Sequence, residues 1–176
     1  MRINDKTLAL VQKQITNEMF NANTYLHMAN WCGYNGYKAM ESMFRSQYEG
    51  ELGHRDRFIN LLLESGYMPE ITTIDSPKVN ILVLEDCVRS ALKLEQKTTM
   101  EICAISDAAE EGSKKDHNVY QAIQWFIEEQ REEEDMFIDM MDFCTNIGLF
   151  DKETPEWAKK QMRNELEKRI AESLEG

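Results

Sequence analysis

The sequence has few residues that interrupt helices and no segment suited to crossing a membrane. Only three prolines and eight glycines occur among its 176 residues, so long helices are permitted along most of the chain. No run approaches the ~20 apolar residues of a transmembrane helix, and the N-terminal residues lack the apolar stretch of a signal peptide. We therefore expect a cytoplasmic protein without a membrane partner.

Cysteine pairs and an excess of basic residues are also missing. The cysteines at positions 32, 87, 103 and 144 form no Cys-x-x-Cys motif, which argues against a disulfide framework and against a zinc or rubredoxin-type site. We expect all four to be reduced packing residues. Thirty-two acidic residues against 20 basic ones give a formal net charge of −12, which repels nucleic acid and attracts cations.

What is present is an apolar pattern with helical spacing, which predicts an all-α fold. Four long helices are expected, covering about residues 5–34, 38–65, 81–111 and 118–146. The polar, proline-bearing stretch 66–80 is too long for a tight helix–helix turn. It therefore predicts a crossover between two antiparallel hairpins, and the segment EGSKKDHN predicts the turn within the second hairpin.

A fifth helix is expected after Pro155, where the chain turns polar and then regains helical spacing. Its narrow apolar stripe consists of Trp157, Met162, Leu166, Ile170 and Leu174. The sequence thus predicts one domain, with a four-helix bundle in residues 1–148 and a C-terminal extension in residues 149–176.

Polar residues interrupt the buried stripe of each long helix near its middle. The interrupting residues are Glu18, Glu51, His54, Glu95, Gln130 and Glu133. Two pairs are spaced by three residues, which places both members of each pair on one helix face. Because antiparallel packing brings the middles of the helices to one depth, we expect these side chains to meet inside the bundle. His27 and His117 lie off the stripes and are expected at the surface.

Four converging carboxylates require a counter-charge, and the stripes contain no Lys or Arg. A buried carboxylate without a partner costs several kcal/mol or keeps its proton. Two divalent cations would neutralise the four charges, and oxygen ligands with one imidazole suit iron or manganese. Taken singly, each glutamate is better explained as a helix-flank residue that reaches solvent, and a lone Glu-x-x-His is a weak motif. The convergence from all four helices is what predicts a di-metal site.

The segments NEMFNANTYLHMANWC, YEGELGHRDRF and QWFIEEQREEE resemble those of bacterial non-haem ferritins, and the resemblance covers roughly residues 5–148. It implies a ferritin-like four-helix bundle with a di-iron ferroxidase centre, which oxidises Fe(II) with O2 or H2O2. It also implies a homo-oligomer, a hollow cage of twenty-four subunits that stores ferric mineral.

The resemblance further implies roles for individual residues. Glu18, Glu51 and His54 correspond to the first iron site, with Glu51 bridging. The second site corresponds to Glu51, Glu95 and Gln130, with Glu133 as an additional ligand. Two aromatic residues match the family's electron donors, and these are Tyr25 and Trp125.

Two positions depart from related families. Similar ferritins build a third iron site from Glu129, Glu132 and Glu133 together with a glutamate directly before the bridging one, but that position is Gly50 here. Haem-binding relatives carry a methionine directly after the bridging glutamate, where this chain has Leu52, so we expect no haem.

Two other classes of function are compatible with the stripes. One is a di-iron or manganese–iron bundle that oxidises an organic substrate, which would need a pocket beside the metals. The other is a metal-free helical scaffold, in which leucines in place of the stripe glutamates would stabilise the fold without functional cost.

Overall fold

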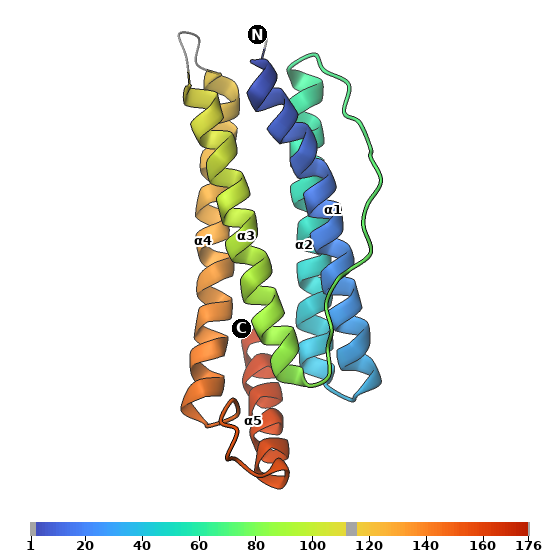
Figure 1. Ribbon diagram of the computed structural model, residues 1–176, viewed down its shortest axis with the longest axis vertical. Coiled ribbons are helices and arrows are strands. Elements are labelled where there is room, and N and C mark those ends of the chain that lie inside the picture. Colours follow the sequence, from blue (N-terminus) through green and yellow to red (C-terminus); the bar gives the residue numbers. More distant parts are fainter. Residues whose placement is uncertain (1–2, 112–115, 176) are drawn as a thin grey trace.

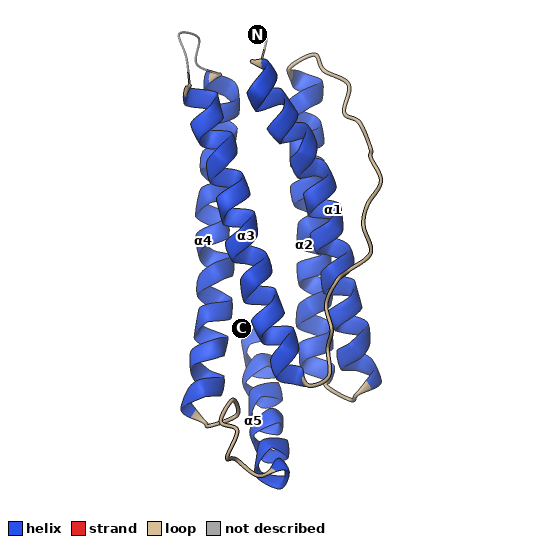
Figure 2. Cartoon of the chain, in the orientation of Figure 1, coloured by secondary structure: helices blue, strands red, loops and turns tan. Residues whose placement is uncertain are grey.

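The computed structural model describes residues 3–111 and 116–175, and these residues form helices and connecting segments without any strand (Figures 1 and 2). The helices are α1 (Asp5–Tyr34), α2 (Lys38–Glu64), α3 (Leu84–Glu110), α4 (His117–Asn146) and α5 (Glu156–Leu174). The predicted all-α fold, its four-helix bundle and its additional C-terminal helix are confirmed. The division of the chain at residue 148 stays a prediction.

The bundle consists of two antiparallel hairpins, α1 with α2 and α3 with α4, joined by a crossover that runs along its length (Figure 1). The crossover is longer than predicted because α3 begins at Leu84 and not near residue 81. The Asp86 carboxylate accepts hydrogen bonds from the backbone N–H groups of Leu82 (2.9 Å) and Val83 (3.1 Å), which caps the helix at this point. Half of the predicted turn EGSKKDHN, residues 112–115, lies outside the described residues.

Local signals set the ends of the first hairpin. The Asn4 side chain accepts a hydrogen bond from the Thr7 N–H (2.8 Å) and so caps α1. Gly36 (φ 87°) and Gly66 (φ 82°) adopt left-handed backbone conformations after α1 and α2, which glycine does without steric cost. These signals lie within a few residues of each helix end, which is why the predicted ends of α1 and α2 agree closely with the structure.

The apolar core is divided into two clusters along the bundle. One contains Tyr25, Met28, Phe44, Val88 and Phe137, and the other contains Val11, Ile15, Phe58, Ile102 and Ile123. On α1, Glu18 and Asn21 lie in the interval between them and are buried. The apolar spacing predicts Leu61 of α2 and Met141 of α4 as core residues, and both predictions are wrong by one position. Leu62 and Met140 occupy the core, whereas Leu61 and Met141 are half-buried.

Helix α5 docks against the end of the bundle opposite the N-terminus through polar contacts as well as apolar ones (Figure 1). Arg163 binds Glu85 of α3 in a two-pronged contact, with N–O distances of 3.1 and 3.0 Å. The Glu167 carboxylate accepts hydrogen bonds from the Ala39 and Met40 N–H groups at the start of α2 (3.0 and 2.9 Å). Of the predicted stripe, Leu166 and Ile170 are buried, Met162 is half-buried, and Trp157 and Leu174 are exposed.

We expect the Arg163→Met substitution to lower the free energy of unfolding by about 3–5 kcal/mol, because it leaves the Glu85 carboxylate buried without its partner. Arg163 and Glu85 are only 7% and 4% exposed. Urea denaturation followed by circular dichroism measures the change. The control is Glu156→Gln, which removes an exposed partner of the same arginine and should cost less than about 1 kcal/mol. Equal stabilities of the Arg163→Met variant and the parent would contradict the prediction.

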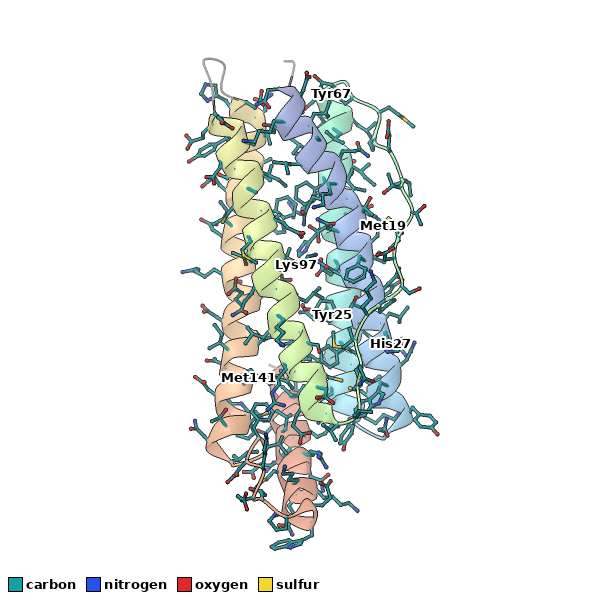
Figure 3. All side chains as sticks on the ribbon, in the orientation of Figure 1. Met19, Tyr25, His27, Tyr67, Lys97 and Met141 are labelled. Atoms are coloured by element: carbon teal, nitrogen blue, oxygen red, sulfur yellow. The ribbon has the colours of Figure 1, made fainter. Side chains whose placement is uncertain are left out.

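The remaining expectations concern surface and thiol positions. His27 and His117 are exposed as predicted, and Figure 3 shows His27 on the outer side of α1. All four cysteines are free, but only Cys32, Cys87 and Cys144 are buried, so the packing role predicted for Cys103 is wrong. No helix in the described ranges has the length and apolar character needed to span a bilayer.

Candidate metal centre

Polar side chains from all four bundle helices fill the level between the two apolar clusters. Glu18 of α1, Glu51 and His54 of α2, Glu95 of α3 and Gln130 of α4 are each at least 93% buried. Glu133 of α4 is half-buried beside them. The structure thus brings together the residues that interrupt the four stripes.

Glu18, Glu51 and His54 form the first group of possible metal ligands. One ligand atom from each lies within 4.8 Å of the others, and His54 Nδ1 is 3.4 Å from Glu51 Oε2. Oxygen Oε2 of Glu18 and Oε2 of Glu51 are buried from solvent, and neither accepts a hydrogen bond from any residue in the described ranges. Buried carboxylate oxygens are costly in this condition, and a shared cation would satisfy both.

Glu95, Gln130 and Glu133 lie on the α3–α4 side of the same level. The Gln130 amide nitrogen donates to Oε2 of Glu95 and Oε2 of Glu133, both at 2.8 Å. It therefore lies between two carboxylates, where a cation would also be attracted. Oxygen Oε1 of Gln130 is buried and has no hydrogen-bond partner among the described residues. This oxygen is therefore free to bind a metal ion.

A further ligand group consists of His54, Glu129 and Glu133, whose ligand atoms also lie within 4.8 Å of one another. Glu129 is half-buried, whereas Glu132 is exposed and belongs to no ligand group found in the described residues. Gly50 is exposed, and beyond its own helix backbone and its two chain neighbours no described atom lies within 4 Å of the position that a Cβ would take. The residues that correspond to the third iron site of similar ferritins are therefore only partly brought together, in line with the departure at Gly50.

Burial changes the protonation of these carboxyl groups. It raises the pKa of Glu18, and the neighbouring Glu51 charge adds to the effect. Burial also raises the pKa of Glu51 and brings that of Glu95 to about 7, although the hydrogen bond from Tyr25 opposes the latter shift. Burial and the nearby carboxylates raise the pKa of Glu133 to about 9. Near neutral pH, part of this site therefore holds protons that a bound cation would displace.

Two aromatic side chains border the centre. Tyr25, which is labelled in Figure 3, is fully buried. It stacks on Phe44 and Phe137 with ring centroids 6.0 and 6.2 Å away and donates its hydroxyl hydrogen to Glu95. Trp125 meets His54 edge to face at 5.7 Å, and the Arg57 guanidinium lies 3.7 Å from the centre of its ring. Both aromatic residues are thus in contact with a possible metal ligand.

Two polar residues that support the site were not identified from the sequence. Gln14 is buried, and its amide donates to Oε1 of Glu18 (2.9 Å). Asn21 is also buried and donates to Thr98 Oγ1 (3.0 Å). Both could have been predicted from their spacing, because Gln14 lies four residues before Glu18 and Asn21 three residues after it, on the same helix face.

We expect the Gln14→Leu substitution to weaken metal binding at Glu18 by about 10–100-fold, the usual effect of losing a residue that orients a ligand. Anaerobic titration of the metal-free protein with Co(II), followed by visible absorption, measures the affinity. Gln12→Leu is the matched control, because the Gln12 amide donates to the Glu70 carbonyl at the surface. An unchanged Co(II) affinity in Gln14→Leu would contradict an orienting role.

Comparisons with known proteins agree with this geometry. The sequence pattern of the ferritin-like domain matches residues 8–146. The chain is 27% identical to the bacterial non-heme ferritin of Escherichia coli O6:H1 over 138 residues, covering 78% of this chain and 82% of that protein. It is 28% identical to the bacterial non-heme ferritin of Staphylococcus aureus USA300 over 141 residues, covering 80% and 84%. Among solved structures, an open pore ferritin from Archaeoglobus fulgidus aligns with a TM-score of 0.81 and 25% identity, covering 94% of this chain and 98% of that one.

Proposed function

The chain belongs to the ferritin family, and we propose that it takes up Fe(II), oxidises it at the buried centre between α1, α2, α3 and α4, and stores the ferric product. The observation that supports this most directly is the pair of carboxylate oxygens on Glu18 and Glu51 that have neither solvent nor a hydrogen-bond donor. Such oxygens, beside an imidazole, form a set of ligands that suits iron.

Two Fe(II) ions are proposed to bind side by side as the substrate. Glu18, Glu51 and His54 would hold one ion. Glu51, Glu95 and Gln130 would hold the other, with Glu133 as an additional ligand. Gln130 carries no charge, so the second ion should be held more weakly, which favours release of the oxidised product. Binding displaces protons from the carboxyl groups whose pKa values are raised by burial.

The proposed oxidation has a simple electron balance. Each Fe(II) loses one electron, and the pair of electrons with two protons converts O2 to H2O2, or H2O2 to two water molecules. Tyr25 could supply one further electron to partly reduced oxygen, because its hydroxyl proton can pass to Glu95, to which it is hydrogen-bonded. Trp125 is the second proposed donor, next to His54.

The oligomeric state of the chain and the place where iron is stored are also proposed. We infer that the chain assembles into a hollow homo-oligomeric cage, as the ferritin family membership suggests, and that mineral collects in the cavity. The twenty-four-subunit stoichiometry, the cytoplasmic location and the absence of haem stay predictions from the sequence. The net charge of −12 favours the attraction of Fe(II) to the protein.

Anaerobic titration with Fe(II), followed by a pulse of oxygen, tests the proposal. The metal-free protein should bind two Fe(II) ions per chain at this centre and oxidise them in one fast phase of absorbance change. Analytical ultracentrifugation of the same sample should show one large particle that becomes denser as iron accumulates. A protein that binds no Fe(II), or that binds it without fast oxidation, would contradict the proposed activity.

A further inference from the structure

A groove of about 360 Å³ opens between α1, α3 and the end of the crossover, and three lysines line it. These are Lys78 of the crossover and Lys93 and Lys97 of α3, all exposed. Figure 1 shows the crossover passing α1 to reach the start of α3, and Figure 3 shows Lys97 near the middle of α3. The other lining residues are Phe20, Thr24, Val79, Asn80, Ser90 and Leu94.

The charge of this groove is opposite to that of the chain as a whole. Among the described residues, none that lines it is acidic, although the chain carries 32 acidic and only 20 basic residues. Lys78 pairs with Asp75 (2.7 Å), and this pair is weak because both side chains are exposed. Lys97 pairs with Glu101 (3.2 Å), whose side chain is only 19% exposed. Lys93 has no ion pair within the part of the chain that the structure describes. Lys78 and Lys93 are therefore available to an anion, and Lys97 lies in the same groove with its charge shared with Glu101.

The interior of the groove is apolar, which restricts the kind of anion. Leu94 is only 8% exposed, Phe20 and Val79 are half-buried, and the Lys97 ammonium lies 5.8 Å from the centre of the Phe20 ring. The Thr24 hydroxyl already donates to the Phe20 carbonyl, so it is engaged within α1. A small inorganic anion would contact the lysines but leave this apolar surface wet. An aromatic ring would cover it.

We propose that this groove binds a small aromatic anion, with its ring against Phe20 and Leu94 and its phosphate or carboxylate group among Lys78, Lys93 and Lys97. The volume lies within the usual range of small-molecule sites, about 300–1,000 Å³. The site is separate from the buried metal centre, because none of its lining residues is a candidate metal ligand. It does not depend on the proposed iron chemistry.

Fluorescence titration of the native, metal-free protein with matched naphthalene probes tests the proposal. We expect 1-naphthyl phosphate to bind at least tenfold more tightly than either 1-naphthol, which lacks the charge, or inorganic phosphate, which lacks the ring. A parallel titration with 1-naphthoate distinguishes the two acid groups. Binding of both acids, or of either one alone, supports an aromatic anion site and identifies its preferred acid.

Charge reversal locates the site. Lys93→Glu combined with Lys97→Glu should weaken binding of 1-naphthyl phosphate at least tenfold, whereas Lys160→Glu, an exposed lysine on α5, should leave it unchanged. Circular dichroism confirms that each variant is folded. Three results would each overturn the proposal: no binding of either naphthalene acid, equal binding of 1-naphthol, or wild-type affinity in the double variant. Phosphate binding as tightly as 1-naphthyl phosphate would also overturn it, since the ring would then contribute nothing.

Discussion

Replacing Glu51 with alanine is expected to abolish the fast phase of Fe(II) oxidation, lowering the initial rate by roughly 10²–10³-fold. Glu51 lies in one ligand group with Glu18 and His54, and the charges of Glu95 and Glu133 act on its carboxyl group as well. Glu51 is therefore the carboxylate that we propose as the shared ligand of both iron ions. Without it, the ions lose a shared ligand and are no longer held close together.

Stopped-flow absorbance after an oxygen pulse measures this rate. The matched control is Glu49→Ala, which removes an exposed glutamate from the same helix, two residues away, and should leave the fast phase intact. A fast phase of unchanged amplitude and rate in Glu51→Ala would show that the buried carboxylates serve another purpose. A metal-free scaffold would then be the better explanation, and Glu51→Leu should stabilise it.

The second large effect concerns pH, because the metal-free protein should lose stability as pH rises from 5 to 9. The pKa of Glu95 rises from its ordinary value of 4.5 to about 7 in the folded protein, and that of Glu133 to about 9. Between the ordinary pKa of 4.5 and the raised pKa of each group, the folded chain binds more protons than the unfolded chain, so ionisation favours unfolding. For the buried Glu95, this pKa shift lowers the free energy of unfolding by about 3 kcal/mol when the group ionises. For a chain of this size, that corresponds to a fall of about 6–12 °C in melting temperature.

The experiment is a series of thermal melts after chelator treatment, followed by circular dichroism across this pH range. Adding Mn(II) should reverse the trend, because the ionised carboxylates then have a cation and ligand binding stabilises the folded state. The isosteric Glu95→Gln variant, which cannot titrate at this position, should show a flatter profile. Surface carboxyl groups with lowered pKa values, such as Glu41 and Asp75, act only below this range. A melting temperature of the metal-free protein that rises with pH would contradict the prediction.

Much of the fold could be predicted from the chain because its signals are local. Helix ends at Gly36 and Gly66 depend on a few neighbouring residues, and the crossover follows from a polar stretch that cannot continue a helix. The start of α3 was less predictable. It depends on the Asp86 side chain turning back to cap Leu82 and Val83, and a carboxylate at that position is equally compatible with a helix that starts earlier.

The candidate site was partly predictable for a different reason. A glutamate in an apolar stripe conflicts with burial, so Glu18, Glu51 and Glu95 were conspicuous. Gln14 and Asn21 carry no charge and created no such conflict, although they contact the same level of the bundle. The helical periodicity also could not predict where α5 docks, because its contact between Arg163 and Glu85 joins residues 78 positions apart.

The sequence by itself determined that the chain forms long helices, where they turn, and that carboxylates occupy their buried faces, because helical periodicity and capping act over a few residues. Only the tertiary structure decided which atoms meet. It grouped His54 with Glu129 and Glu133 but left Glu132 exposed, and it brought Lys78 of the crossover beside Lys93 and Lys97 of α3. These outcomes depend on how helices and the crossover are rotated and placed against one another, and that is set by packing across the whole bundle.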